Sequence, residues 1–151
     1  MLRARLKDAI KDAMLAKESA RLSTLRLISA AVKDRDIAAR SEDNADGVSD
    51  AEILAILGKM IKQRQDAATA YEEAGRVELA EQELSEITVI EGFLPKQLSD
   101  DDIKAAIQEA ITQTGASSIR DMGKIMGVLK AKYPGQMDFG KAGGQVKALL
   151  V

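Results

Sequence analysis

The sequence predicts an all-α protein, with an N-terminal bundle of about four helices and a small three-helix C-terminal domain. Apolar residues recur at three-to-four-residue spacing along most of the 151 residues, which is the period of a helix face. Aromatic residues make up only 3% of the chain, whereas Ala, Leu, Lys, Glu and Gln are abundant, and this composition favours helices over strands. Glycines, prolines and capping residues separate the periodic segments.

The first half of the chain predicts the bundle. Residues 2–16 and 19–40 each carry an apolar face, and the faint break between them leaves open whether they form two helices or one bent helix. We expect a polar loop over residues 41–47. Ser49 and Glu52 have the spacing of a capping box and predict the start of the next helix.

That helix is expected to end at Gly75, in the left-handed conformation that suits a C-terminal cap. A fourth helix is predicted from Val77 to about Glu91, and its expected inward residues are Ala80, Leu84, Ile87 and Ile90.

Pro95 predicts the boundary between two domains, residues 1–93 and 94–151, because the residue before a proline is disfavoured in a helix. Ser99 with Asp102 predicts the start of the next helix, and Gly115 its end. Ser118 with Asp121 gives a weaker capping box for a helix that begins at Ile119. Pro134 and Gly135 break that helix, and a last one, weakened by Gly140, Gly143 and Gly144, is predicted from about Asp138 to Leu150.

The absence of cysteine and histidine narrows the chemistry that this chain could perform. It excludes disulfides, thiolate nucleophiles, histidine bases, and metal sites built from thiolate or imidazole. The run Asp100–Asp102 is best interpreted as the acidic first turn of a helix. We therefore expect no catalytic residue, cofactor or metal. No apolar run approaches the ~20 residues that span a bilayer, so we expect no membrane partner and a cytoplasmic chain.

Basic residues are concentrated at the two ends of the chain. Residues 1–40 hold 10 basic and 5 acidic side chains, whereas residues 41–94 hold 4 and 13. Arg26, Lys33 and Arg40 stand one heptad apart on one helix face. Lys59, Lys62 and Gln63 form a second polar cluster. Either group could hold phosphates, or could be a solvated face whose intrahelical ion partners are Asp36 and Asp66.

The last 33 residues carry a net charge of +4. Here we predict a binding face centred on Lys124, Lys130 and Lys132, with Arg120 at its edge. Asp121 is expected to cap the helix. Two readings stay open for Gly123 and Gly127: they admit another helix at close range, or they contact a ligand with their backbone.

Five motifs together resemble one family, the YqeY or GatB/YqeY proteins, across essentially the whole chain. They are Arg21–Ile28, Lys62-Gln63-Arg64, Ala74-Gly75-Arg76, Leu94-Pro95-Lys96-Gln97-Leu98 and Asp121-Met122-Gly123-Lys124-Ile125-Met126-Gly127. The last two are the most specific, and they mark Pro95, Gln97, Gly123 and Gly127 as structural motif residues.

The resemblance implies a C-terminal domain similar to the tail of the B subunit of the tRNA-dependent amidotransferase. It is also similar to tails found on some glutaminyl-tRNA synthetases, and in these settings the tail helps to hold tRNA. The implied partners are therefore tRNA and an amidotransferase or aminoacyl-tRNA synthetase. Proteins of this family are also often assigned, by homology, carbon–nitrogen ligase activity with glutamine as amide donor.

Three functions compete at this point. The first is a tRNA-binding accessory module, with Arg26, Lys33 and Lys62 as further nucleic-acid contacts. The second is a helical protein-interaction or scaffold module with no RNA role. The third, an amidating ligase in its own right, ranks last because the sequence offers no nucleophile, phosphate loop or metal set. We expect no independent activity.

Overall fold

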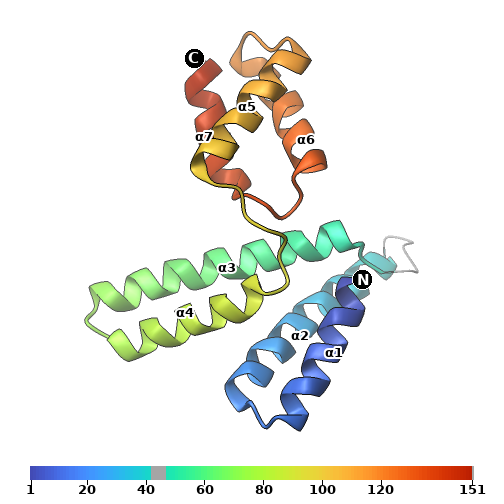
Figure 1. Cartoon of the computed structure of the whole chain (residues 1–151), viewed down its shortest axis with the longest axis vertical. Coiled ribbons are helices and arrows are strands. Elements are labelled where there is room, and N and C mark those ends of the chain that lie inside the picture. The colour runs from blue at the N-terminus through green and yellow to red at the C-terminus, as the bar shows by residue number, and fades with distance from the viewer. Residues whose placement is uncertain (42–46, 151) are drawn as a thin grey trace. The chain divides into compact units, whose positions relative to one another are not determined.

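A computed structural model of the chain describes residues 1–41 and 47–150. Within these residues the secondary structure is entirely helical, with seven α-helices, one short 3₁₀ turn and no strand (Figure 1). The predicted all-α class is thereby confirmed. The chain divides into two compact units, Met1–Leu94 and Pro95–Val151. Most of the polar loop expected over residues 41–47 lies outside the described residues.

The N-terminal unit contains α1 (Leu2–Leu15), α2 (Ser19–Ser41), α3 (Asp50–Glu73) and α4 (Val77–Glu91). The first two segments are separate helices rather than one bent helix, because the chain turns between them with a positive φ of 57° at Lys17. The capping box is confirmed: the Ser49 Oγ accepts from the Glu52 amide at 3.3 Å, and the Glu52 carboxylate accepts from the Ser49 amide at 2.9 Å. Gly75 has the expected left-handed φ, +73°.

The core of this unit is aliphatic and draws on all four helices. Its fully buried side chains include Leu25, Ile28, Leu57 and Ile90. Ala80, Ile87 and Ile90 are buried as predicted, but the expectation that Leu84 points inward was wrong, since 46% of this residue is exposed. Sequence periodicity places a residue on a helix face, whereas burial also needs a neighbouring element to cover that face.

Arg3 of α1 and Asp36 of α2 join the helices to the start of α3. The Arg3 guanidinium donates to both Asp36 carboxylate oxygens, at 2.7 Å for one of them, and to the carbonyl of Val48 at 2.9 Å. Asp36 also accepts from the Val48 amide at 2.9 Å. The hydrogen bonds from the Arg3 guanidinium, and to a smaller extent the one from the Val48 amide, lower the pKa of Asp36 from 3.8 to about 2. Asp36 therefore makes its hydrogen bonds outside its own helix, with Arg3 and Val48, although the charge of Arg40, four residues on in α2, also lowers its pKa.

The C-terminal unit contains α5 (Asp100–Thr114), the 3₁₀ turn η1 (Ile119–Asp121), α6 (Met122–Lys132) and α7 (Phe139–Leu150). The Ser99 hydroxyl caps α5 by accepting from the Asp102 amide at 3.2 Å, and Gly115 ends the helix with a φ of +65°. Asp100–Asp102 form the acidic first turn of α5, as expected. Four of the most deeply buried core side chains are Ile107, Ile125, Leu129 and Val146.

Two capping predictions near α6 were wrong. Ser118 makes no capping hydrogen bond, and a 3₁₀ turn occupies the residues where the α-helix was expected to begin. Asp121 does not cap α6 either, because its carboxylate turns back to accept from the Ser117 amide at 3.1 Å. The next helix, α7, does have a side-chain cap. The carboxylate of Asp138 accepts from the amides of Gly140 and Lys141 in its first turn.

Gln97, a residue of the Leu94–Leu98 motif, ties the start of the C-terminal unit to the turn between α6 and α7. Its side-chain amide donates to the carbonyl of Gly135 at 2.7 Å and to that of Pro95 at 3.0 Å. The Leu98 amide adds a hydrogen bond to the carbonyl of Gln136 at 2.9 Å. This motif therefore holds the segment before α5 against the turn that follows α6.

Candidate nucleic-acid interface

One side of α6 is an exposed surface that combines cations with glycines. Arg120 on η1 and Gly123, Lys124, Gly127 and Lys130 on α6 are all exposed. Ile125 and Leu129 on the opposite side are completely buried, and they fix the orientation of the helix. Arg120, Lys124 and Lys130 form no ion pair with any residue that the structure describes. We call these five exposed residues the α6 face.

No helix of the C-terminal unit packs against the two glycines of the α6 face. A Cβ atom built on Gly123 or Gly127 would meet none of the described atoms within 4 Å, so the interpretation that they admit the last helix was wrong. The glycine that lies at the helix contact is Gly143 of α7, where a Cβ would stand 3.3 Å from Cε of Met122. Gly123 and Gly127 instead leave the backbone of α6 bare at two positions beside Lys124 and Lys130.

Lys132, also predicted for this face, is engaged within the unit. Its ammonium group lies 3.0 Å from a carboxylate oxygen of Glu109 on α5 and 5.7 Å from the ring centroid of Tyr133. The hydrogen bond to Glu109 is the main reason that the pKa of Lys132 is raised. An external phosphate at Lys132 would have to compete with Glu109. The three cations without an ion pair in the described structure are therefore the better candidates for phosphate contact. The partner Glu109 could not have been identified from sequence spacing.

The basic residues predicted in the N-terminal unit lie on separate helices. Arg26 and Lys33 are exposed on α2, and Lys62 is exposed on α3. None of them forms an ion pair among residues 1–41 and 47–150. These cations remain predicted contacts. Helix α2 contains no glycine, whereas on α3 Gly58 is exposed, has nothing within 4 Å of a built Cβ, and stands four residues before Lys62.

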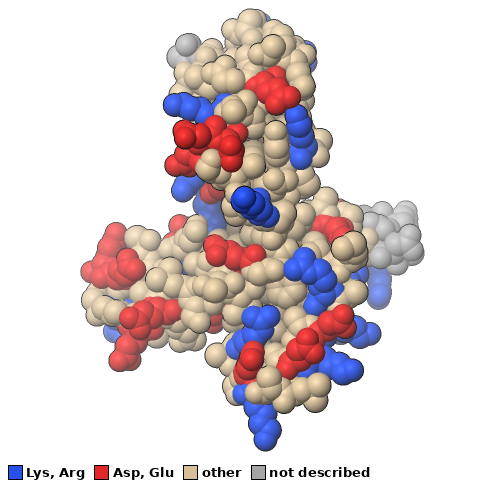
Figure 2. Space-filling view, viewed as in Figure 1, with Lys and Arg blue, Asp and Glu red and all other residues tan. Residues whose placement is uncertain are grey.

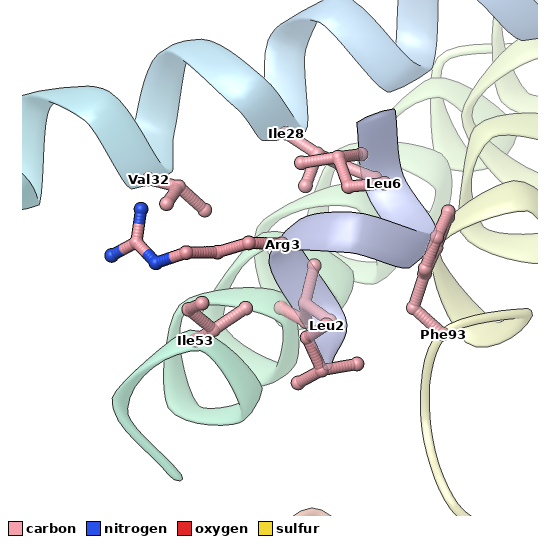
Figure 3. A pocket seen from close by; sticks show the side chains of 8 residues that line it. Leu2, Arg3, Leu6, Ile28, Val32, Ile53 and Phe93 are labelled. Carbon is pink, nitrogen blue, oxygen red and sulfur yellow. The ribbon is translucent and has the colours of Figure 1, made fainter. Parts of the chain in front are cut away.

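The N-terminal unit also contains two hollows. The first, of about 10 Å³, is enclosed by apolar side chains that include Leu6, Ile28 and Phe93. In Figure 3 the aliphatic stem of Arg3 lies along its edge, with the guanidinium directed away from Phe93. This volume is no larger than about one water molecule, so it is a packing gap rather than a ligand site. The second is an open hollow of about 290 Å³ lined by Arg5, Asp8, Ala9, Asp12, Arg21, Gly92 and Phe93.

The guanidinium of Arg5 lies 5.5 Å from the ring centroid of Phe93 in this open hollow and donates to the carbonyl of Gly92 at 3.0 Å. Arg5 thus connects α1 to the end of α4.

Among the described residues there is no group of three acidic, histidine or cysteine side chains that could hold a metal ion. No helix in the described part of the chain has the length and apolar character needed to cross a membrane.

Comparison with known proteins assigns the family. The family model for the Yqey-like protein matches residues 3–150. Proteins named altered inheritance of mitochondria protein 41, mitochondrial, are among the relatives. That of Clavispora lusitaniae is 30% identical over 114 residues, which cover 74% of this chain and 64% of the relative. That of Lachancea thermotolerans is 29% identical over 117 residues, which cover 76% and 60%.

The chain therefore spans less than two thirds of the length of these relatives. The family match, in contrast, extends over nearly all of its own length and includes both helical units. This chain belongs to the Yqey-like protein family.

Proposed function

We propose that the chain is an accessory module that binds tRNA through the α6 face. The observation that carries this proposal is the pair of exposed glycines between cations that have no ion partner in the described structure. A glycine in a helix interior costs roughly 1 kcal/mol relative to alanine, and packing within this unit does not compensate for Gly127. Close approach of a ligand backbone to α6 would explain why glycine, and not a residue with a side chain, occupies both positions.

The chemistry of the α6 face suits a phosphodiester chain. Arg120, Lys124 and Lys130 can neutralise phosphates, and Gly123 and Gly127 on the same side of the helix carry no side chain that would keep a ligand backbone at a distance. No aromatic side chain belongs to the α6 face, so binding would rest on phosphate and sugar contacts rather than on base stacking. This mode fits a folded RNA recognised by its shape, such as tRNA.

The resemblance to the amidotransferase tail supports the same ligand and suggests that an amidotransferase or a tRNA synthetase is the associated enzyme. The proposal assigns tRNA binding to this chain and leaves amide transfer to such a partner. A cytoplasmic site of action is our prediction from the sequence. Because the relatives bear mitochondrial names, a mitochondrial site is the alternative.

Gly127→Ala tests the proposal because it separates structure from binding. The added methyl group meets no neighbouring atom, so the free energy of unfolding should rise by up to about 1 kcal/mol. The same methyl group should weaken tRNA binding if a ribose–phosphate chain lies against the helix. Gly144→Ala, on the exposed side of α7 and equally free of contacts, is the matched control. A Gly127→Ala protein that is more stable and binds tRNA as well as the wild type would refute the proposal.

A further inference from the structure

Helices α3 and α4 form a hairpin, and only the half away from its turn contributes residues to the aliphatic core of the unit. We call residues 64–86 the distal arm. The aliphatic core of the unit takes Ile53, Leu57, Met60 and Ile61 from α3 and Ile87 and Ile90 from α4, all outside the arm. Within the arm the buried apolar residues are Ala68 and Ala80, which belong to neither core cluster. Figure 1 shows the arm extending beyond α1 and α2.

An ion pair holds the base of the arm together. The Arg64 guanidinium lies 3.0 Å from a carboxylate oxygen of Glu86 and also donates to the Met60 carbonyl at 3.2 Å. The Arg64 and Glu86 side chains are only 14% and 20% exposed. Arg64 therefore neutralises one glutamate of α4 and is not available to the others.

The remaining surface of the arm is predominantly acidic, and Arg76 at the turn is its one further cation. Helix α4 contains five glutamates and no lysine or arginine. Glu78 and Glu81 stand three residues apart, a spacing at which like charges repel each other. Glu72 and Glu73 add further acids at the end of α3. Figure 2 shows acidic side chains gathered around the turn end of the α3–α4 pair. Such a surface repels nucleic acid and attracts cations.

Apolar side chains lie exposed within this acidic surface. Val77 is 58% exposed and Leu84 is 46% exposed, and they stand seven residues apart, so they lie on the same side of α4. Leu79, which is 38% exposed, stands two residues from Val77 and therefore lies on nearly the opposite side of the same helix. Single exposed leucines are ordinary on protein surfaces, but two apolar residues two turns apart, with glutamates beside them, match one face of an amphipathic partner helix.

We propose that the distal arm docks a basic amphipathic helix of a partner protein. Val77 and Leu84 contact apolar residues of that helix spaced at i and i+7, while Glu78 and Glu81 pair with its lysines and arginines. The occupant is cationic because the arm holds seven acidic residues against two basic ones, and one of these two, Arg64, is already paired with Glu86. This surface belongs to the N-terminal unit and is separate from the α6 face, so the two proposals can fail independently.

The test uses the full chain and a labelled synthetic helical peptide, with leucines on one face and lysines on the other, and follows fluorescence anisotropy. We expect saturable binding that weakens as salt is added. Glu78→Lys/Glu81→Lys and Val77→Ser/Leu84→Ser should each weaken it by about tenfold. The matched control, Asp100→Lys/Asp101→Lys, makes the same charge change at exposed residues of α5 and should bind like the wild type. Circular dichroism checks that each variant is folded.

Four results would overturn the proposal. The first is an absence of peptide binding to the wild type. The second is an equal loss in the control, which would reveal non-specific charge attraction. The third is an undiminished affinity of the Val77→Ser/Leu84→Ser protein, which would remove the apolar contact. The fourth is a dimer in light scattering that Glu78→Lys/Glu81→Lys dissociates, which would assign the arm to a second copy of this chain.

Discussion

A Cβ atom on Gly47 would lie 2.6 Å from Oδ1 of Asp36 and 3.0 Å from a guanidinium nitrogen of Arg3. The hydrogen bonds among Arg3, Asp36 and Val48 hold both side chains in place, so neither can retreat easily. Gly47 also has a φ of +83°, which other residues rarely adopt. Glycine is thus favoured at this position for two reasons: a side chain would clash with Asp36 and Arg3, and the backbone conformation is unfavourable for other residues.

The first prediction is that Gly47→Ala lowers the free energy of unfolding by about 1–3 kcal/mol. Gly75→Ala is the matched control, because Gly75 has a similar φ of +73° but open space around its Cβ position. Urea denaturation of both variants measures the difference. Equal losses in the two proteins would show that the contact with Asp36 contributes nothing.

The second prediction concerns acid stability. The folded chain lowers the pKa of Asp36 from 3.8 to about 2, so the contribution of this ionised carboxylate is complete above pH ~4 and is lost as the pH falls towards 2. Asp36→Asn should therefore unfold more easily than the wild type at neutral pH, and the difference should shrink between pH ~4 and ~2. Denaturation at a series of pH values measures it. A difference that stays constant over that range would contradict the assignment.

The helix boundaries and caps of this protein were largely predictable because they depend on local chemistry. Ser49 with Glu52, Gly75, and Ser99 with Gly115 act through backbone groups a few residues away. The contact between Arg3 and Asp36 was not predictable, since it joins residues 33 apart in the sequence through tertiary packing.

The same limit explains the errors about the candidate site. The sequence marks Gly123, Gly127 and Gly143 alike as glycines in helices, but only the packing of α6 against α7 shows which one is covered. The exposure of Leu84 likewise follows from the length of the hairpin relative to its neighbours, which no local pattern contains.

The third prediction tests the packing at Gly143. A valine there would press its side chain against Met122 and Met126, and overpacking of this kind costs about 1–3 kcal/mol. Gly144→Val places the same side chain one residue further along α7, where a Cβ meets nothing within 4 Å. Thermal unfolding should show a clearly larger loss for Gly143→Val. If both variants melt together, the close contact between α6 and α7 is not a source of stability.

The salt dependence of tRNA binding tests whether cations of the α6 face bind tRNA phosphates. Each phosphate contact contributes about 0.9 to the slope of log affinity against log salt concentration. Lys124→Ala/Lys130→Ala should therefore weaken binding and flatten that slope by about 1.8. Lys96→Ala/Lys104→Ala, which removes equal charge from exposed positions of the same unit, should leave the slope near that of the wild type. An unaltered affinity and slope in the Lys124→Ala/Lys130→Ala protein would contradict the account.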